Sequence, residues 1–192
     1  MKLGTVLYLT IATLAQALAV DPQYRGIEIG PEGIVIPPDS PAGLYHISFS
    51  QDSTKILNVT FEADAAPADA GVQRRHYKQL EARQGLPINY YRCFDGLDGS
   101  DYGGPKNDFI NSCNAGAWAN PFSTVARVGR KGTVVWMCNK ANVPNRCFGG
   151  EYQLFEQFMD IQCGGFLRGG FADVDVFFKS YGRTRPGQPF CS

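Results

Sequence analysis

Three aspartates, Asp95, Asp98 and Asp101, stand at every third position in the Gly- and Ser-rich stretch FDGLDGSDYGG. Carboxylates spaced in this way in a loop can ligate Ca²⁺, and two of them can act as the acid and the base that cleave a glycosidic bond. The stretch lacks the closing Glu of an EF-hand loop. Asp and Gly residues also satisfy backbone groups in ordinary turns, so we favour a solvated turn and expect no metal ion or other cofactor.

Histidine, the commonest general base, is scarce. The chain has two histidines, His46 and His76, and both precede Gln84. The G-x-S-x-G, HExxH and P-loop motifs are absent from the sequence, and these motifs mark common hydrolases and nucleotide-binding enzymes. From Gln84 onward, a Ser-His-Asp triad or a two-histidine mechanism is excluded. We therefore assign no catalytic residue.

Two further sets of side chains are candidates for binding. Basic residues near the C-terminus could form a contact patch for a charged partner: Arg168, Lys179, Arg183 and Arg185. A solvated tail pinned by Cys191 is the alternative. Aromatic residues could bind carbohydrate or a receptor if they are exposed, although packing in the core or at its rim is the simpler expectation: Tyr90, Tyr91, Trp118 and Tyr181.

The N-terminus has the features of a secretory signal peptide. It reads MKLGTVLYLTIATLAQALA, with Lys2 before an apolar run and a small-x-small pattern that ends at Ala19. The run is too short to span a bilayer, and it predicts removal of residues 1–19 by signal peptidase after Ala19. We therefore expect a secreted protein without a membrane span.

Six cysteines, an even number, fit a disulfide framework in an oxidising compartment: Cys93, Cys113, Cys138, Cys147, Cys163 and Cys191. No C-x-x-C pair occurs and histidines are few, so a zinc site is not expected. Two cysteines lie near predicted helix ends and two on predicted strands, which favours bridges between helix and sheet. If one bridge is local, Cys138–Cys147 is our candidate, because it would close the loop NKANVPNR.

The chain divides into two parts of different character. Residues 20–83 contain no cysteine and carry an acidic first half, whereas residues 84–192 contain all six cysteines. Ala, Asp, Gly and Pro dominate the start of the connecting stretch ADAAPADAGVQRRHYKQLEARQ, and this composition is typical of a flexible linker. It contains a dibasic site ending at Arg75 and a second basic site at Arg83. We predict cleavage there, which would make residues 20–83 a pro-segment; the alternative is an uncut linker with the N-terminal half permanently docked.

The predicted pro-segment contains a β-hairpin. The stretches GLYHISF (43–49) and KILNVTF (55–61) alternate between apolar and polar residues around the turn residues SQDST. A lone hairpin is only marginally stable in water, so its apolar face must pack on the cysteine-rich part. Asn58-Val59-Thr60 is an N-glycosylation sequon within this hairpin.

The cysteine-rich part predicts an α+β fold. Its pattern reads as a strand at 86–94, a short helix that starts near Pro105 and stops at Gly116, and two strands within 122–138. A helix at 149–165 and a single strand at 169–182 follow. This β-α-β-β-α-β order predicts a split sandwich, with an antiparallel sheet and both helices on one face.

The stretches WMCNKANVPNRC, CGG and KSYGR give residues 84–192 a resemblance to small secreted cysteine-rich proteins of filamentous fungi. More distantly, the predicted order of elements is similar to killer toxins of the KP4/KP6 type and to fungal effectors of that shape. The resemblance implies an extracellular protein that acts on a plant host, on a competing fungus or on the fungal wall. It names no receptor and no toxic residue.

These observations lead to one expectation and two alternatives. We expect a monomeric secreted protein that acts by extracellular binding, as an effector or killer-toxin-like antagonist, with a protein or a wall component as its partner. The alternatives are a carboxylate-dependent hydrolase that acts on cell-wall polysaccharide, and a structural wall protein. The formal net charge is zero, which gives no reason to expect nucleic acid as a partner.

Overall fold

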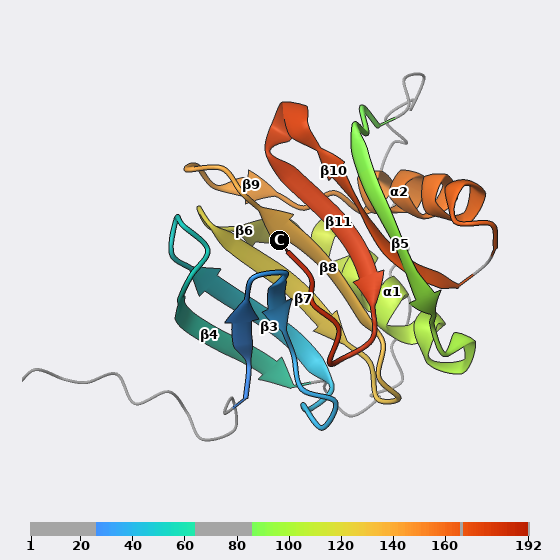
Figure 1. The fold of residues 1–192 in the computed structure, drawn as a ribbon, viewed down its shortest axis with the longest axis horizontal. Coiled ribbons are helices and arrows are strands. Elements are labelled where there is room, and N and C mark those ends of the chain that lie inside the picture. Colours follow the sequence, from blue (N-terminus) through green and yellow to red (C-terminus); the bar gives the residue numbers. More distant parts are fainter. Residues whose placement is uncertain (1–25, 64–85, 166, 192) are drawn as a thin grey trace, which may run out of the picture.

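A computed structural model describes residues 26–63, 86–165 and 167–191. The predicted cleavage sites at Ala19, Arg75 and Arg83 lie outside these residues. The fold is α+β, with an antiparallel sheet of seven strands and two helices that cover one of its faces (Figure 1). The helices are α1 (Gly99–Asn114) and α2 (Gly149–Gln162).

The large sheet has the strand order β4-β3-β7-β8-β11-β10-β5, and every neighbouring pair is antiparallel. Its strands are β3 (Gly43–Phe49), β4 (Ile56–Ala63), β5 (Tyr90–Gly96), β7 (Ser123–Val128), β8 (Val134–Asn139), β10 (Arg168–Val174) and β11 (Lys179–Thr184). Two short pairs lie outside it: β1 (Glu28–Gly30) with β2 (Gly33–Val35), and β6 (Trp118–Ala119) with β9 (Asn145–Arg146).

The predicted single strand at 169–182 is wrong. The stretch forms two strands, β10 and β11, which pair around a 3-10 turn at Asp175–Phe177. The turn closes with Phe178 in the left-handed region, at φ 51°. Asp175 is the one typical turn residue in this turn, and Val174, Val176 and Phe178 continue a strand-like alternation through it, so the sequence pattern favoured a single strand. The observed order after residue 86 thus ends in a hairpin.

The predicted start of the first helix near Pro105 is also wrong, because α1 begins at Gly99. Asp98 is the N-cap residue, and its side chain accepts a hydrogen bond from the Ser100 N–H at 2.9 Å. A side-chain cap of this kind satisfies one of the free N–H groups of the first turn. The two glycines before Pro105 are poor helix formers, and they concealed the true start.

The residues of the predicted N-terminal hairpin form β3 and β4, and β3 also pairs with β7. The hairpin is therefore part of the large sheet. A register shift between Ser48 and Phe49 places Ile56 opposite Phe49 and leaves Leu57 64% exposed. Strict alternation in KILNVTF would place Leu57 on the same face as Val59 and Phe61, but the shift places Ile56 there instead.

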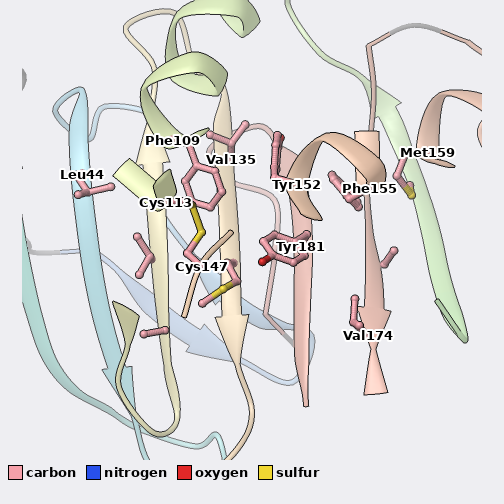
Figure 2. Close-up of a cluster of buried hydrophobic side chains, with 14 of the residues drawn as sticks. Leu44, Phe109, Cys113, Val135, Cys147, Tyr152, Phe155, Met159, Val174 and Tyr181 are labelled. Carbon is pink, nitrogen blue, oxygen red and sulfur yellow. A yellow bond between two sulfur atoms is a disulfide. The ribbon is translucent and has the colours of Figure 1, made fainter. Parts of the chain in front are cut away.

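Two apolar clusters lie on opposite faces of the sheet. The first, which we call the helix-side cluster, lies under α1 and α2 and contains Phe109, Tyr152, Phe155 and Met159 (Figure 2). The second, which we call the back cluster, lies on the other face around Trp136 and Phe190. The back cluster draws on both parts of the chain; the N-terminal part contributes Ile34, Ile36, Tyr45, Ile47 and Phe49.

Three disulfides join distant elements: Cys93–Cys163, Cys113–Cys147 and Cys138–Cys191. Cys93–Cys163 connects β5 to the end of α2, a bridge between helix and sheet of the predicted kind. The local pair Cys138–Cys147 is wrong, because Cys138 bonds to Cys191 and fixes the C-terminal segment on the sheet. Cys113–Cys147 lies within the helix-side cluster (Figure 2).

Candidate functional site

Six exposed apolar side chains gather where the β10–β11 turn, the β8–β9 loop and β6 meet, and we call this surface the aromatic end. Two hydrogen bonds to backbone carbonyls join its segments. The Asn145 side chain donates to the Phe177 carbonyl at 2.7 Å, and the Lys140 N–H donates to the Phe178 carbonyl at 2.7 Å. Figure 1 shows the β10–β11 turn at the same end of the sheet as β9. Its members are Trp118, Val143, Phe148, Val176, Phe177 and Phe178.

A buried lysine holds two of these rings in place. The Lys179 ammonium is 2.5 Å from a Glu151 carboxylate oxygen and lies over the Phe148 and Phe177 rings, 5.2 and 5.1 Å from their centroids. Tyr181 donates to the same carboxylate oxygen at 2.6 Å. Burial, and then the nearby Glu151 charge, raise the pKa of Tyr181, so its hydroxyl stays a donor. The outer faces of Phe148 and Phe177 are thus presented by a fixed cation–aromatic cluster.

Arg146 extends the aromatic end toward Trp118. Its guanidinium lies over the Phe148 ring at 5.1 Å, and Arg146 is directly opposite Trp118 in the β6–β9 pair. No ion pair with a carboxylate is found for Arg146 among the residues that the structure describes. The β8–β9 loop is fixed as well, because the buried Asn139 side chain donates to the Val143 carbonyl at 2.7 Å. The surface is therefore preorganised on both sides.

A polar cleft between α1 and α2 is the second candidate site. It has a volume of about 430 Å³ and is lined by Tyr102, Lys106, Gln153, Glu156, Gln157, Asp160 and Arg183. Arg183, on β11, is 1% exposed, and its guanidinium pairs with Asp160 and donates to the Tyr102 hydroxyl at 3.3 Å. A Glu156 oxygen lies 3.8 Å from the same guanidinium. The cleft is thus built around a buried cation with two carboxylates beside it.

Electrostatics keep these groups in fixed protonation states. Burial opposes the charge on Arg183, but Tyr102 and Asp160 outweigh it and raise the pKa of the guanidinium. Burial also raises the pKa of Tyr102, whose hydroxyl donates to Glu156. Tyr102 therefore remains a neutral donor and Arg183 a cation at any physiological pH.

The three aspartates Asp95, Asp98 and Asp101 do not form a shared site. Asp98 caps α1, and its hydrogen bonds with Ser100 lower the pKa of its carboxyl. Asp101 accepts from the Thr133 N–H at 3.1 Å, and Asp95 is exposed on β5. Within the described ranges, no group of three or more acidic, His or Cys side chains is placed to hold a metal ion. Asp98 thus acts locally, at a helix start.

The predicted basic patch is wrong, because two of its four members are buried. Lys179 and Arg183 are 3% and 1% exposed on β11, whereas Arg168 and Arg185 are exposed. Helix α2 supplies the carboxylates that compensate the buried pair. Lys and Arg are rarely buried unless they are paired in this way. The residue pattern of β11 does not predict that a helix packs on this strand, so it could not predict the burial of Lys179 and Arg183.

The aromatic predictions are mixed. Tyr90, Tyr91 and Trp118 are exposed, whereas Tyr181 is fully buried under α2. Sequence reasoning missed Phe148, Phe177 and Phe178 as surface residues. A signal existed for Phe177 and Phe178, because they belong to the run of three apolar residues before Lys179, which is too long for a strand with one wet face. No such run contains Phe148.

The sequon residue Asn58 is exposed on β4, the edge strand of the sheet. Its side chain therefore lies where a glycan would point into solvent. Glycosylation at Asn58 remains a prediction.

Comparison with known proteins adds no assignment. No helix in the described part of the chain has the length and apolar character needed to cross a membrane. Three disulfides are typical of extracellular proteins. A comparison with protein-family models, curated proteins and solved structures finds no match to this chain.

Proposed function

We propose that this protein is a secreted, disulfide-rich fungal protein that acts by extracellular binding, as an effector or killer-toxin-like antagonist, and that the aromatic end is its binding surface. The observation that carries the proposal is the rigid display of exposed apolar residues. Val176 and Phe178 are 68% and 65% exposed, yet the backbone on either side of them is hydrogen-bonded. Contiguous exposed apolar surface of this kind marks interaction sites.

The composition of the aromatic end favours a protein partner. Trp, Phe and Arg are enriched at the centres of protein interfaces, and a few such side chains carry most of the binding free energy. Here Trp118, Arg146 and Phe148 stand next to one another. Because Phe177 and Phe148 are held by Lys179 before any partner arrives, little side-chain entropy is lost on binding.

Binding explains this surface better than catalysis does. His46 is the only histidine among the described residues, and it lies on β3, in a different part of the sheet from the aromatic end. Asp98 caps α1 and Asp101 accepts from the Thr133 N–H, so both carboxylates are engaged in local hydrogen bonds. A surface with aromatic rings and the Arg146 guanidinium, which forms no ion pair within the described part of the chain, has the groups for recognition and lacks an acid–base pair.

The proposal includes the route by which the protein matures. Signal-peptide removal after Ala19 would deliver the chain to an oxidising compartment, where its disulfides form. Cleavage after Arg75 or Arg83 would cut the chain between the N-terminal part and the cysteine-rich part, and the β3–β7 ladder and the back cluster would still hold the two together. We also propose a distant relationship with the killer-toxin-like class, in which the final strand of the split sandwich is replaced here by the β10–β11 hairpin.

The test is binding of the labelled secreted protein to intact cells and isolated walls of a plant and of a competing fungus. The variant Val176→Thr/Phe178→Asn removes apolar surface, and Asn tolerates the left-handed backbone of Phe178. The matched control is Leu57→Thr/Ile161→Gln, which alters two exposed apolar residues elsewhere. We expect at least a tenfold loss of cell binding for the first variant only.

Protease treatment of the cells separates the two kinds of partner. Loss of binding after treatment would support a protein receptor. Binding that is equal for both variants, or that persists on protease-treated cells and purified wall, would contradict a protein-binding role for the aromatic end.

A further inference from the structure

We propose that the polar cleft between α1 and α2 binds a neutral saccharide. This site is separate from the aromatic end, and the inference does not depend on the function proposed above. The cleft volume of about 430 Å³ is within the range of small-molecule sites. The side chains that line this cleft, however, are more polar than those of most small-molecule sites.

The first argument is the chemical character of the lining. All seven lining side chains carry hydrogen-bonding groups, whereas most small-molecule sites are lined mainly by apolar side chains. On α2 the contributing residues follow the spacing i, i+3, i+4 and i+7, so they share one face of the helix: Gln153, Glu156, Gln157 and Asp160. Such a wall suits a ligand with hydrogen-bonding groups over much of its surface.

The second argument is charge. Two cations, Lys106 and Arg183, face two carboxylates, Glu156 and Asp160. The formal charge of the lining is thus balanced. The carboxylates would repel an anionic ligand, and Lys106 together with the buried charge of Arg183 would repel a cationic one, so neither gains from the field of the cleft as a whole. A neutral ligand has no such penalty.

The third argument is which groups are still available. Glu156 uses one carboxylate oxygen for Tyr102, Lys106 and Arg183, and Asp160 uses one for Arg183. The second oxygen of each carboxylate has no partner among the described residues, and the same is true of the side-chain amides of Gln153 and Gln157. The Lys106 ammonium, with three donors, has one carboxylate at 3.7 Å.

Available donors and acceptors therefore stand next to each other in the cleft. A hydroxyl group both donates and accepts, so neighbouring hydroxyls on a sugar ring can donate to the carboxylates and accept from Lys106 and the amides. Few other neutral compounds present hydroxyls in that density. The inference from the lining is thus a sugar, in contrast to an apolar small molecule.

The fourth argument is preorganisation. Arg183 also donates from Nε to the Arg168 carbonyl at 2.8 Å, which fixes the plane of the guanidinium. That plane in turn fixes Asp160 and Tyr102. Arg183 is a positioning residue here, because it is buried behind the groups that would touch the ligand. A site with its polar groups already in place loses less entropy when it binds.

The experiment is a titration of the full secreted chain with short oligosaccharides, followed by isothermal calorimetry and by chemical shifts of α1 and α2. The neutral probes are β-1,3-glucan, β-1,4-glucan and N-acetylated chitin hexamers. The charged probes of similar size are oligogalacturonate and deacetylated chitosan. We expect at least one neutral probe to bind and to shift the amides of α1 and α2, and we expect neither charged probe to bind there.

The variant Gln153→Ala/Gln157→Ala should weaken that binding at least tenfold, because it removes two exposed amides without touching the Arg183 pairs. Gln162→Ala is the matched control, since Gln162 is an exposed glutamine at the end of the same helix. Unchanged thermal unfolding of all variants confirms that the fold is intact. The aromatic-end variant should bind the saccharide normally, which separates this test from the previous one.

Four results would overturn the assignment. The first is the absence of binding by every neutral probe, and the second is tighter binding of a charged probe. The third is equal affinity of Gln153→Ala/Gln157→Ala and Gln162→Ala. Shortening of the oligosaccharide during the titration would also overturn it, because the cleft would then be an active site.

Discussion

The N-terminal part, residues 26–63, and the cysteine-rich part, residues 86–191, are held by different means. All three disulfides lie within the cysteine-rich part. The N-terminal part is held by the β3–β7 ladder, from Gly43 opposite Val128 to Ser48 opposite Ser123, and by the back cluster. The disulfides therefore cover only part of the folded unit, because the sheet and the core also include the N-terminal part. The positions of the disulfides do not mark the limits of the fold.

The two faces of the sheet differ in a related way. The back cluster, to which the N-terminal part contributes, consists of apolar side chains around Trp136. The helix face carries two buried cations, Lys179 and Arg183, compensated by carboxylates of α2. The N-terminal part should thus be sensitive to lost apolar volume, and the helix face to lost charge partners.

The largest effect should follow removal of the Cys138–Cys191 bridge by Cys138→Ala/Cys191→Ala. Its sequence separation of 53 residues corresponds to about 4 kcal/mol of lost stability in the loop-entropy estimate. The bridge also fixes Phe190, whose carbonyl accepts from the Ile34 N–H at 2.6 Å. Hydrogen exchange at Ile34 should therefore accelerate in this variant. The control Cys93→Ala/Cys163→Ala removes a bridge with a sequence separation of 70 residues and so loses a similar amount of stability, but it should accelerate exchange at Ile34 much less. Equal acceleration in both variants would show that the Cys138–Cys191 bridge does not anchor the N-terminal part.

Truncation of Ile47 tests whether the N-terminal part belongs to the core. Ile47 is fully buried in the back cluster, so Ile47→Ala should cost about 3 kcal/mol in urea unfolding of the full chain. Leu57→Ala, on the same hairpin but exposed, should cost less than about 0.5 kcal/mol. If the two variants unfolded at the same urea concentration, the N-terminal hairpin would not contribute to the stability of the core.

Loss of Arg183 tests the helix face. Arg183→Met should cost about 3 kcal/mol at neutral pH, because it leaves Asp160 and Glu156 without their cation. Urea unfolding of the full chain measures this. The double variant Arg183→Met/Asp160→Asn also removes the charge of one stranded carboxylate, so it should recover part of the lost stability. A double variant no more stable than Arg183→Met would mean that lost packing, and not charge, dominates.

The smallest effect concerns His46, a half-buried residue on β3. Burial lowers the pKa of His46 below its ordinary value of 6.5, although Glu62 opposes the shift. The unfolded chain then binds a proton more readily than the folded one, so stability should fall slightly as pH drops through 6.5. His46→Gln should remove that part of the pH dependence in thermal unfolding. If the native chain gained stability on acidification relative to His46→Gln, the pKa of His46 would be raised in the folded state, which would contradict the prediction.

Local pattern predicted much of the fold, because periodicity reports which side chains must be buried. The β3–β4 alternation and the Tyr152, Phe155, Met159 stripe of α2 were identified for this reason. The start of α1 was missed because its capping residue precedes a glycine-rich turn. The β10–β11 turn was missed because its one typical turn residue, Asp175, lies within an alternating apolar pattern that is typical of a strand.

The candidate sites were harder to predict because they depend on contacts between distant elements. Lys179 and Arg183 look like surface residues until α2 places Glu151 and Asp160 above them. Cys191 could have paired with any of five cysteines until β8 and the C-terminal segment came together. The spacing of residues along the chain does not predict these contacts between distant elements. Only Trp118 and the two exposed tyrosines of β5 could be chosen in advance.

The most direct test of a single folded unit is a cut in the linker. A site-specific protease sequence placed after Arg83 would be cleaved in the native protein, and the product would be analysed by size exclusion and native mass spectrometry. No cysteine precedes Cys93, so no disulfide can keep the fragments together. We predict that both fragments elute as one complex and separate only in denaturant. Release of the N-terminal fragment from a cysteine-rich fragment that keeps its spectrum and its unfolding temperature would contradict the account.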